Sequence, residues 1–480
     1  MEKHNQNPDI SDIINFTNSQ GIKARGTLLR SSENQIVFET YNPYSIVQLS
    51  EVLSEVKITR LDEAIYNGKA VVSNLINTGL ILIVSATLVD SWSEKFKPDK
   101  KIDIANEALE FVSEWHQLNN KIRPYYQLSV GKVRSFLIET NRWIEQFSYA
   151  MSSIDHGQLS DNTIDKIAEP FLMSLKTLLD NFESEARQIE ISTDISEKDF
   201  CKRYAQKELH PLIMQSPFVH RTFSKPLGYA GDYEMVNMML RNPLEGETSY
   251  AKLVNLFFLK AGPAEAHRNR IDILYDLLKE VAIKAKNAGH KAKIFNFACG
   301  PALEIQRFIE QEEISENCEF YLLDFSAETL EYTQKTLEEC KRKGGNRKVE
   351  ITYINKSVHD VLRHTTNLEK AKTQIEKDFD LVYCAGLFDY LSDKVCARML
   401  KLFFWQLKPG AIMMATNVHS SNPNRCTMEQ LMEWYLIYRD EGGFSSLINE
   451  VNGTEKRIYT DKTGYNIFLE MKKSATENKT

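Results

Sequence analysis

The chain has 480 residues, of which 42% are hydrophobic and 26% are charged, and its formal net charge is −7. These values are typical of a globular protein with a sizeable core, and the length suggests two to four domains. The acidic balance and the lack of a long Lys/Arg block argue against a dedicated nucleic-acid-binding protein.

The cysteines and the most apolar segment indicate a reducing compartment. The seven cysteines form no C-x-x-C pair, so the sequence predicts neither a disulfide framework nor a bound metal. The opening residues MEKHNQNPDI lack the basic-then-apolar order of a signal peptide, and GLILIVSATLV (79–89) is too short to span a bilayer. We therefore expect a cytoplasmic protein without a transmembrane segment.

Residues from about 20 to 95 have the pattern of short β-strands. Apolar or alternating runs such as QIVFET, KAVVSNLI and GLILIVSATLV are separated by the turn-like segments SSEN, YNG and INTG. This pattern predicts a small antiparallel β-barrel, which we place at residues 15–98.

Helical periodicity follows over residues 99–210. Leu109, Val112 and Trp115 lie at helical spacing, and the polar stretch 152–165 is expected to be a loop between helices. The segment predicts a helical domain that acts as a spacer or as the contact of a homodimer.

Residues 211–290 form a candidate lid or connector that leads into the next domain. The stretch is rich in Pro, Gly and aromatic residues, and it ends in the amphipathic segment EAHRNRIDILYDLLKEVAIKAK. KPLGYAGDYEM (225–235) is the candidate lid, because Gly228 and Gly231 allow bending. The alternative is a well-packed connector between domains.

Strands alternate with helical segments from residue 293 to about 473. The strand-like runs AKIFNF, EFYLLDF, VEITYIN, FDLVYCA and GAIMMATNV are separated from one another by helical patterns, which favours βαβ units and a parallel sheet. EKRIYT and YNIFLEM have no helix between them and should pair as an antiparallel hairpin. We place an α/β domain at residues 291–473.

The stretch AKIFNFACGPALEI (292–305) predicts a strand, a turn of small residues and a helix. Small residues let the backbone approach a ligand, but an ordinary tight turn has the same pattern. Asp324 ends the next strand, 24 residues after Gly300, where a carboxylate can accept hydrogen bonds from a ribose. A dinucleotide fingerprint would need Gly near 298 and 303, where this chain has Ala298 and Leu303, so a nucleoside-like cofactor without pyrophosphate is favoured.

Taken together, FNFACGPALE, LLDFS, INKSVHD and DLVYCAGLFDYL resemble the class I S-adenosylmethionine-dependent methyltransferases over about residues 290–473. The resemblance implies a Rossmann-like domain with a seven-stranded sheet and S-adenosylmethionine as cofactor. Ala298 stands where the family has the first glycine of its loop, and we expect a negative φ there, because alanine avoids the left-handed region.

The same resemblance implies the residues that contact the cofactor. Phe325 would flank the adenine, Ser357 and Val358 would lie at its edge, and the segment after the fourth strand would form the floor where cofactor and acceptor meet. The implied cofactor-binding residues are Asn296, Ala298, Cys299, Gly300, Asp324, Phe325, Ser357, Val358, Cys384, Ala385 and Gly386. For the two cysteines the alternative is a small buried apolar residue without a chemical role.

The segment after the fourth strand constrains the acceptor. AGLFDY differs from the [DN]-P-P-[FY] of enzymes that methylate nucleic-acid bases. The candidate catalytic residues are Tyr229, Asp389 and His419; Asp389 could instead cap the next helix, and His419 could be a solvated loop residue. Few bases are in view, which agrees with carboxyl O-methylation, since a carboxylate is already ionised at pH 7. Candidate anchors for that carboxylate are Arg221, Arg268, Arg270, Arg425 and Arg439.

A wider resemblance involves HPLIMQSPFVHRTFSKPLGYAGDYEMVNMMLRNP, PAEAHRNRID and NPYSIVQLSEVLSE. These segments are similar to bacterial proteins with a PilZ-like N-terminal domain and a methyltransferase domain, labelled as biosynthesis proteins for 3-hydroxypalmitic acid methyl ester. The resemblance implies a small acidic or lipid-like acceptor, such as a 3-hydroxy fatty acid. The alternatives are another small metabolite, a protein acceptor, or a signalling adaptor that binds the cofactor without turnover.

PilZ domains bind cyclic di-GMP through R-x-x-x-R and [DN]-x-S-x-x-G. Here Arg25 and Arg30 are five residues apart, and Ile76 stands between Asn74 and Gly79 where a serine is expected. These departures disfavour cyclic di-GMP as a ligand and favour a structural or protein-contact role for the barrel.

Overall fold

The computed structural model describes most of the chain. It covers residues 12–41, 47–60, 63–77, 81–93, 96, 104–151, 158–229, 231–363, 377–448 and 454–475. Gly79, the segment 42–46 of NPYSIVQLSEVLSE and residues 152–157 of the expected loop lie outside this range.

The chain divides into two compact units whose boundaries are interleaved. Unit 1 comprises Met1–Ala230, Asn242–Phe258 and Pro423–Trp434, and unit 2 comprises Gly231–Arg241, Leu259–Asn422 and Tyr435–Thr480. The expected domains were continuous, whereas each unit here is assembled from three separate segments.

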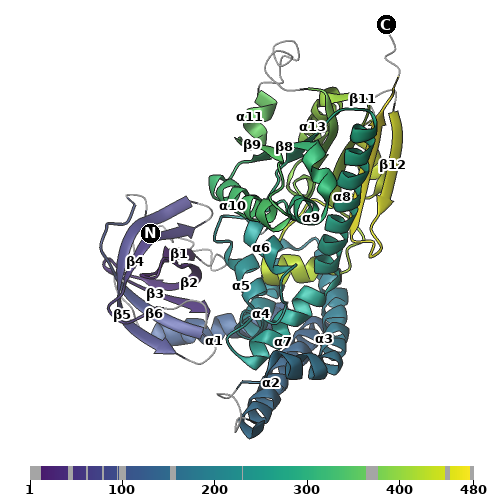
Figure 1. Ribbon diagram of the computed structural model, residues 1–480. Coiled ribbons are helices and arrows are strands. Elements are labelled where there is room, and N and C mark those ends of the chain that lie inside the picture. Colours follow the sequence, from purple (N-terminus) through teal and green to yellow (C-terminus); the bar gives the residue numbers. More distant parts are fainter. Residues whose placement is uncertain are drawn as a thin grey trace. The chain divides into compact units, whose positions relative to one another are not determined.

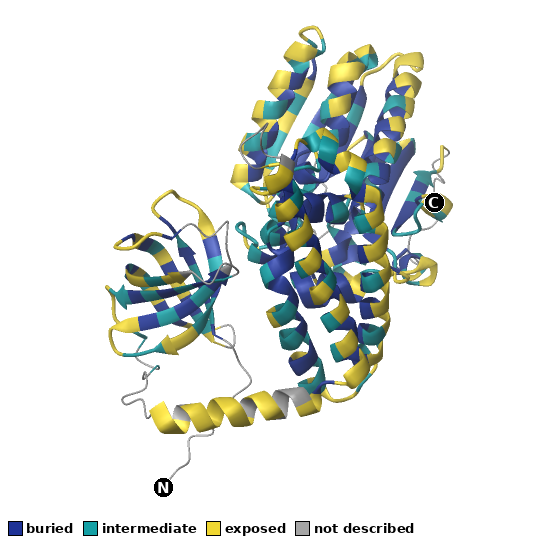
Figure 2. Cartoon of the chain, turned by 90° about the horizontal axis from the view of Figure 1, so that it is seen from below, coloured by how far each residue is buried: buried dark blue, intermediate teal, exposed yellow. Residues whose placement is uncertain are grey.

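Unit 1 begins with a closed antiparallel barrel with the strand order β1-β2-β3-β6-β5-β4 (Figure 1). Side chains alternate between the barrel interior and the surface, which Figure 2 shows as alternating dark blue and lighter residues. The strands are β1 (Ile13–Thr17), β2 (Lys23–Ser31), β3 (Gln35–Tyr41), β4 (Val52–Arg60), β5 (Glu63–Asn77) and β6 (Ile81–Leu88). The predicted barrel is confirmed, and its PilZ-like identity stays a prediction.

Helices make up the rest of unit 1. They are α1 (Ile104–Lys121), α2 (Pro124–Met151), α3 (Asp161–Glu190), α4 (Ile195–Ile213), α5 (Pro217–Ser224) and most of α7 (Ser249–Lys260). The loop predicted over 152–165 extends too far, because α3 begins at Asp161 and residues 161–165 are helical. The Ser160 side chain accepts a hydrogen bond from the Thr163 N–H and caps this helix. The homodimer expected through this region stays a prediction.

A buried carboxylate explains why Pro423–Trp434 belongs to unit 1. Glu183 of α3 accepts hydrogen bonds from the backbone N–H groups of Cys426 and Thr427, each at 2.8 Å. These residues lie at the start of a π-helical turn, Thr427–Leu431. The first N–H groups of a helix have no acceptor within the helix, and here Glu183 supplies it. The same contact holds the segment against α3.

Unit 2 is built on a seven-stranded sheet with the order β12-β13-β11-β10-β7-β8-β9. The strands are β7 (Ala292–Phe297), β8 (Cys318–Asp324), β9 (Glu350–Asn355), β10 (Phe379–Cys384), β11 (Leu407–Val418), β12 (Thr454–Thr460) and β13 (Asn466–Lys473). β13 runs antiparallel to both of its neighbours, β11 and β12, so the predicted hairpin and the predicted sheet are both confirmed. The strand order reverses between β7 and β10, where open α/β sheets bind their ligands.

Helices cover both faces of this sheet (Figure 1). One core contains side chains of α8 (Gly262–Asn287), α9 (Leu303–Gln311) and α10 (Ala327–Lys343). The other contains side chains of α11 (Val358–Arg363), α13 (Asp393–Gln406) and α14 (Glu441–Ser446). Adjacent residues of β7 enter opposite cores, Ile294 the first and Phe295 the second, as the alternation of a strand requires.

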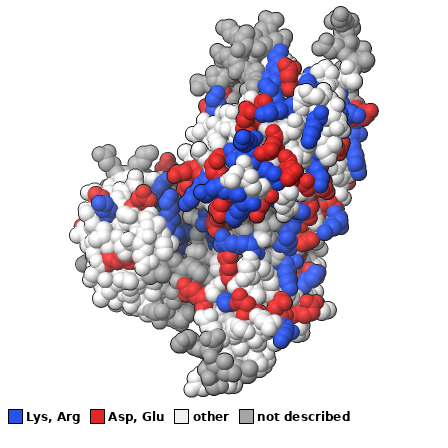
Figure 3. Space-filling view, in the orientation of Figure 1, with Lys and Arg blue, Asp and Glu red and all other residues white. Residues whose placement is uncertain are grey.

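The charged side chains are mixed on the surface. Lys and Arg alternate with Asp and Glu over the face that Figure 3 shows. Within the described part of the chain, no helix has the length and apolar character needed to cross a membrane. The described residues also include no group of three His, Cys, Asp or Glu side chains placed to hold a metal ion.

Candidate functional site

The loop after β7 has a left-handed backbone at alternate residues. The φ angles of Ala298, Gly300 and Ala302 are 55°, 52° and 52°. The expectation of a negative φ at Ala298 was therefore wrong. Alanine has the smallest side chain that meets this strain, which costs about 1 kcal/mol, and the Cys299 N–H, which donates to the Leu323 carbonyl oxygen at 3.0 Å, helps to hold the loop.

Asp324 ties this loop to the end of β8. Its Oδ2 accepts a hydrogen bond from the Gly300 N–H at 3.1 Å, and its Oδ1 accepts one from the Ser326 N–H at 3.0 Å. Burial raises the pKa of Asp324, and these N–H groups partly offset that effect. A Cβ built on Gly300 meets no atom within 4 Å, so the loop borders open space beside the carboxylate. Phe325, the next residue, is 57% exposed.

A buried polar network lies beneath the loop. The Tyr383 hydroxyl donates to Oε1 of Glu304 at 2.6 Å, and the Asn296 amide donates to Oε1 of Glu304 at 3.1 Å and to the Tyr383 oxygen at 2.9 Å. Burial raises the pKa of Glu304. Sequence analysis missed Glu304 and Tyr383; the available signal was a carboxylate on the otherwise apolar inner face of α9. The amide of Asn296 is committed to this network, and its contact with a cofactor stays a prediction.

The remaining residues expected around the adenine and the floor lie at the ends of β9 and β10. The Ser357 hydroxyl donates to Oδ2 of Asp360 at 2.6 Å at the start of α11, and Val358 packs against the second core. Gly386 has φ 96° and donates its N–H to the Thr416 hydroxyl oxygen at 3.1 Å. Burial raises the thiol pKa of both Cys299 and Cys384, which suits inert packing residues.

Asp389 is buried and follows Gly386 in the segment after β10. One carboxyl oxygen accepts the Val418 N–H at 2.6 Å, and burial raises the pKa of Asp389 to about 7. The alternative that Asp389 caps the next helix is wrong, since the N-cap of α13 is Ser392.

His419 is engaged in the loop after β11. Its Nδ1 lies 2.6 Å from the Ser421 hydroxyl, and its Nε2 lies 3.4 Å from a carboxylate oxygen of Glu441. Its backbone N–H donates to the Tyr465 carbonyl oxygen at 2.7 Å. Both ring nitrogens therefore have partners within this loop region, and a catalytic role for His419 stays a prediction.

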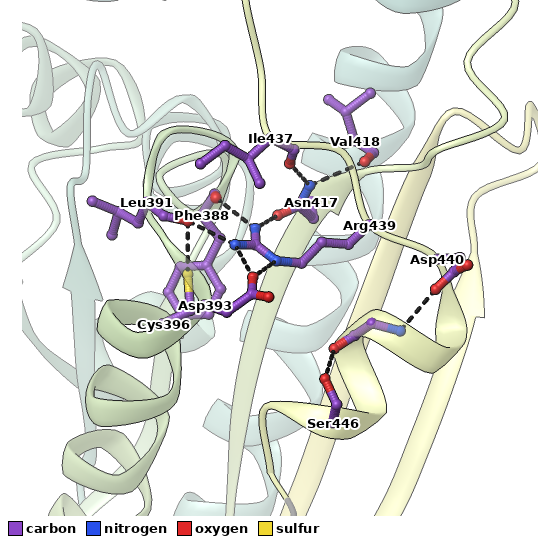
Figure 4. A network of polar contacts seen from close by, with 11 residues as sticks. Phe388, Leu391, Asp393, Cys396, Asn417, Val418, Ile437, Arg439, Asp440 and Ser446 are labelled. Atoms are coloured by element: carbon purple, nitrogen blue, oxygen red, sulfur yellow. Dashed lines mark hydrogen bonds and ion pairs between the residues drawn. The ribbon is translucent and has the colours of Figure 1, made fainter.

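Arg439 organises the loop between β10 and α13 (Figure 4). Its guanidinium donates to the carbonyl oxygens of Phe388 at 2.8 Å and Leu391 at 2.6 Å, and to the Asn417 side-chain oxygen at 2.5 Å. It also forms an ion pair with Asp393 at 2.8 Å. All of these partners belong to the protein, so Arg439 positions the loop and is not available as an anchor for an acceptor.

The other candidate anchors differ in what they already bind. Arg268 donates to Glu265 at 2.9 Å and to the carbonyl oxygens of Met239 and Leu259 at 2.9 and 3.0 Å. Arg425 belongs to unit 1 and pairs with Glu429 at 2.9 Å. Arg270 lies against Gly386, because a Cβ built on that glycine would be 3.2 Å from Nη1 of Arg270. Of these three, Arg270 is the one that lies beside Gly386, a residue predicted to form the floor of the site.

The candidate lid divides between the two units. Tyr229 belongs to unit 1 and is half-buried, and its catalytic role stays a prediction. In unit 2, a Cβ built on Gly231 would be 2.7 Å from the Tyr390 hydroxyl. Tyr233 stacks on Tyr332 of α10 with 4.6 Å between ring centroids. The segment from Gly231 therefore contacts residues that follow both β10 and β8.

Arg25 of the barrel has partners within unit 1. Its Nη1 lies 2.9 Å from a carboxylate oxygen of Glu433, and its guanidinium lies 4.5 Å from the centroid of the Phe223 ring. Ile76, which replaces the expected serine, is 54% exposed. Arg25 is thus engaged by a protein carboxylate and an aromatic ring.

No protein-family model and no curated protein matches this sequence. Among solved structures, the chain is similar to a possible exported protein from Bordetella parapertussis, with 13% identity over 66% of this chain and 100% of that chain and a TM-score of 0.39. It is also similar to magnesium protoporphyrin IX methyltransferase (ChlM) from Synechocystis PCC 6803 with bound SAH, with 11% identity over 45% and 88% of the two chains and a TM-score of 0.32. A third is the N-methyltransferase NodS from Bradyrhizobium japonicum WM9, with 12% identity over 44% and 98% and a TM-score of 0.27.

Proposed function

We propose that unit 2 is an S-adenosylmethionine-dependent methyltransferase. The observation that carries the proposal is the hydrogen bond between Gly300 and Asp324, which joins the ends of β7 and β8 beside open space. The Asp324 carboxylate accepts from the N–H groups of Gly300, Ser326 and Phe325, and since a carboxylate has about four acceptor sites, it keeps capacity for a ribose hydroxyl. Exposed Phe325 would flank the adenine, and residues 298–300 would pass under the methionine part of the cofactor.

The acceptor proposed is a carboxylate on a small acidic or lipid-like molecule, such as a 3-hydroxy fatty acid. When bound, S-adenosylmethionine supplies an electrophilic methyl group. The two predicted bases have partners in the protein: Asp389 accepts the Val418 N–H, and both ring nitrogens of His419 have neighbours. An acceptor that is already ionised needs no deprotonation, so these contacts favour a carboxylate over an alcohol or amine.

The proposed compartment is the cytoplasm. All seven cysteines are free and buried, which suits a reducing environment. The chain's own residues would supply binding and orientation of the two reactants, which is the main requirement of methyl transfer.

Calorimetric titration with S-adenosylhomocysteine tests the cofactor. Wild type should bind, and Asp324→Ala should bind on the order of 100-fold more weakly, because it loses the ribose contact and the tie to Gly300. Asp272→Ala is the matched control, since Asp272 is an exposed residue of α8 whose carboxylate pairs with Arg307 at 2.5 Å. Failure of the wild type to bind would remove the cofactor and with it the proposed activity.

Transfer of a labelled methyl group to cell extracts tests the acceptor. A carboxyl methyl ester releases its label as volatile methanol in mild alkali, and we expect such label in the acidic lipid fraction. Alkali-stable label would instead identify an N- or O-alkyl product of another metabolite or protein. Tight cofactor binding without any transfer would favour the signalling adaptor.

A further inference from the structure

Arg270 is a buried cation that forms no hydrogen bond or ion pair with any of the described residues. It lies on α8 and is 8% exposed, yet no hydrogen bond or ion pair joins its guanidinium to any residue that the structure describes. Arg268 and Arg439, in the same unit, use their donors on protein oxygens. A buried charge without a partner is costly, so its retention points to a ligand that supplies the missing acceptor.

The position of Arg270 places that ligand at the carboxyl edge of the sheet. Nη1 lies 3.2 Å from where a Cβ of Gly386 would be, and Gly386 follows β10 directly after Cys384 and Ala385. Any larger residue at 386 would press on the guanidinium, and its φ of 96° also favours glycine. The open donors therefore lie where the cofactor and the acceptor are proposed to meet.

The acidic groups that act on Arg270 compensate its charge only in part. Asp389 and Glu304 act on Arg270 more strongly than any other charged group, but neither is hydrogen-bonded to it: Asp389 accepts the Val418 N–H, and Glu304 accepts from Tyr383 and Asn296. Burial raises the pKa of both carboxyl groups, for Asp389 to about 7, so each holds a proton more readily than an ordinary carboxylate. Neither provides the fixed negative charge that a guanidinium normally pairs with.

We propose that Arg270 is the carboxylate-binding residue of this site. Its planar fork suits the two oxygens of a carboxylate, which it would bind through two parallel hydrogen bonds. The inference rests on the proposed function for the identity of the ligands, which leaves two sources of that carboxylate: the methionine part of the cofactor and the acid of the acceptor.

Binding measurements separate these sources. Wild type, Arg270→Lys and Arg270→Gln are titrated with S-adenosylhomocysteine, with 5′-methylthioadenosine, which lacks the carboxylate, and with 3-hydroxydecanoate. If Arg270 binds the cofactor, Arg270→Gln should lower the affinity for S-adenosylhomocysteine on the order of 100-fold and leave the affinity for 5′-methylthioadenosine unchanged. The affinity of Arg270→Lys for S-adenosylhomocysteine should lie between those of wild type and Arg270→Gln. If it binds the acceptor, only the affinity for 3-hydroxydecanoate falls.

Thermal unfolding distinguishes a ligand-binding role of Arg270 from a purely structural one. Because Arg270 forms no hydrogen bond or ion pair in the described part of the chain, Arg270→Gln should raise the Tm of the ligand-free protein and lose the ligand-induced rise. Arg307→Gln is the control: this α9 residue pairs with Asp272, and its loss should leave both the affinities and the ligand-induced rise unchanged.

The role of Arg270 and the proposed function would be overturned by different results. Equal affinities of wild type and Arg270→Gln for all carboxylates, or a lower Tm without ligand, would overturn the role of Arg270. If the wild type bound neither nucleoside, the proposed function would fail, while binding of 3-hydroxydecanoate and its loss in Arg270→Gln would still support the carboxylate site.

Discussion

Gly300 donates its backbone N–H to Oδ2 of Asp324 across 3.1 Å, and this bond couples the loop after β7 to the end of β8. The Thr333 hydroxyl of α10 donates to the Gly300 carbonyl oxygen at 2.7 Å, so both polar backbone groups of the glycine are held. The loop is therefore fixed in its left-handed conformation before any ligand binds. Preorganisation of this kind reduces the entropy lost on binding.

Two substitutions in this loop should differ in their effect on stability. Gly300→Ala should cost about 1 kcal/mol, because φ is 52°, and should weaken S-adenosylhomocysteine, because the new methyl group enters the open space. Ala298→Gly relieves similar strain but increases the freedom of the unfolded chain, so stability should change by less than about 1 kcal/mol. Urea denaturation and calorimetry check both. Wild-type affinity in Gly300→Ala would show that the open space is not used by the ligand.

Much of unit 2 could be predicted from the sequence because its signals are local. AKIFNF is almost continuously apolar, as a strand covered on both faces must be, and its successor is a turn of small residues. β1 (Ile13–Thr17) precedes the expected strands, and its five residues are too few to show a clear strand pattern. The φ of Ala298 is set by the path of the loop and has no signature in the residue itself.

The interleaving of the units could not be predicted, because the contact that causes it joins distant residues. Glu183 binds Cys426 and Thr427, which are 243 and 244 positions away, and neither segment is unusual in composition. The sequence also could not distinguish Arg268 from Arg270 as the residue beside Gly386, for a related reason. Residues two apart on a helix point to different faces, and only the fold shows which face meets Gly386.

Asp389→Asn should remove a dependence of stability on pH. The pKa of Asp389 rises from 3.8 to about 7 on folding, so the folded chain keeps a proton that the unfolded chain loses in this range. Stability contributed by this group is thus lost as pH rises from about 4 to about 7, on the order of 4 kcal/mol in total. The asparagine variant should become increasingly more stable than wild type over that interval. Urea denaturation between pH 4 and pH 8 measures it, and parallel curves would contradict the pKa shift.

Arg439→Met should destabilise unit 2 by about 3 kcal/mol, since three buried or partly buried oxygens each lose a hydrogen bond worth about 1 kcal/mol. The affected acceptors are Phe388, Leu391 and Asn417, which hold the loop after Gly386. Arg457→Met is the control, because Arg457 is exposed and lies over the Tyr459 ring at 4.4 Å. Denaturant unfolding compares the two variants, and equal midpoints would show that the network of Figure 4 contributes little.

Glu433→Gln should destabilise unit 1 at neutral pH. The carboxylate lies 2.9 Å from Arg25 and 3.0 Å from Lys202, and its backbone oxygen accepts from Lys225 at 2.7 Å. Loss of its charge removes a carboxylate counterion from these partly buried cations, which costs about 3 kcal/mol. Although burial alone would raise it, Arg25 and Lys202 lower the pKa of Glu433 from 4.5 to about 2.

The sign of the pH effect distinguishes this pair from a packing defect. A carboxyl group with a lowered pKa stabilises the folded chain above about pH 4.5 and loses that contribution as pH falls towards 2. The difference between wild type and Glu433→Gln should therefore shrink from pH 7 to pH 3 in urea denaturation, whereas a packing defect would persist. Asp180→Asn, in an exposed pair with Lys176, should show no such difference at either pH.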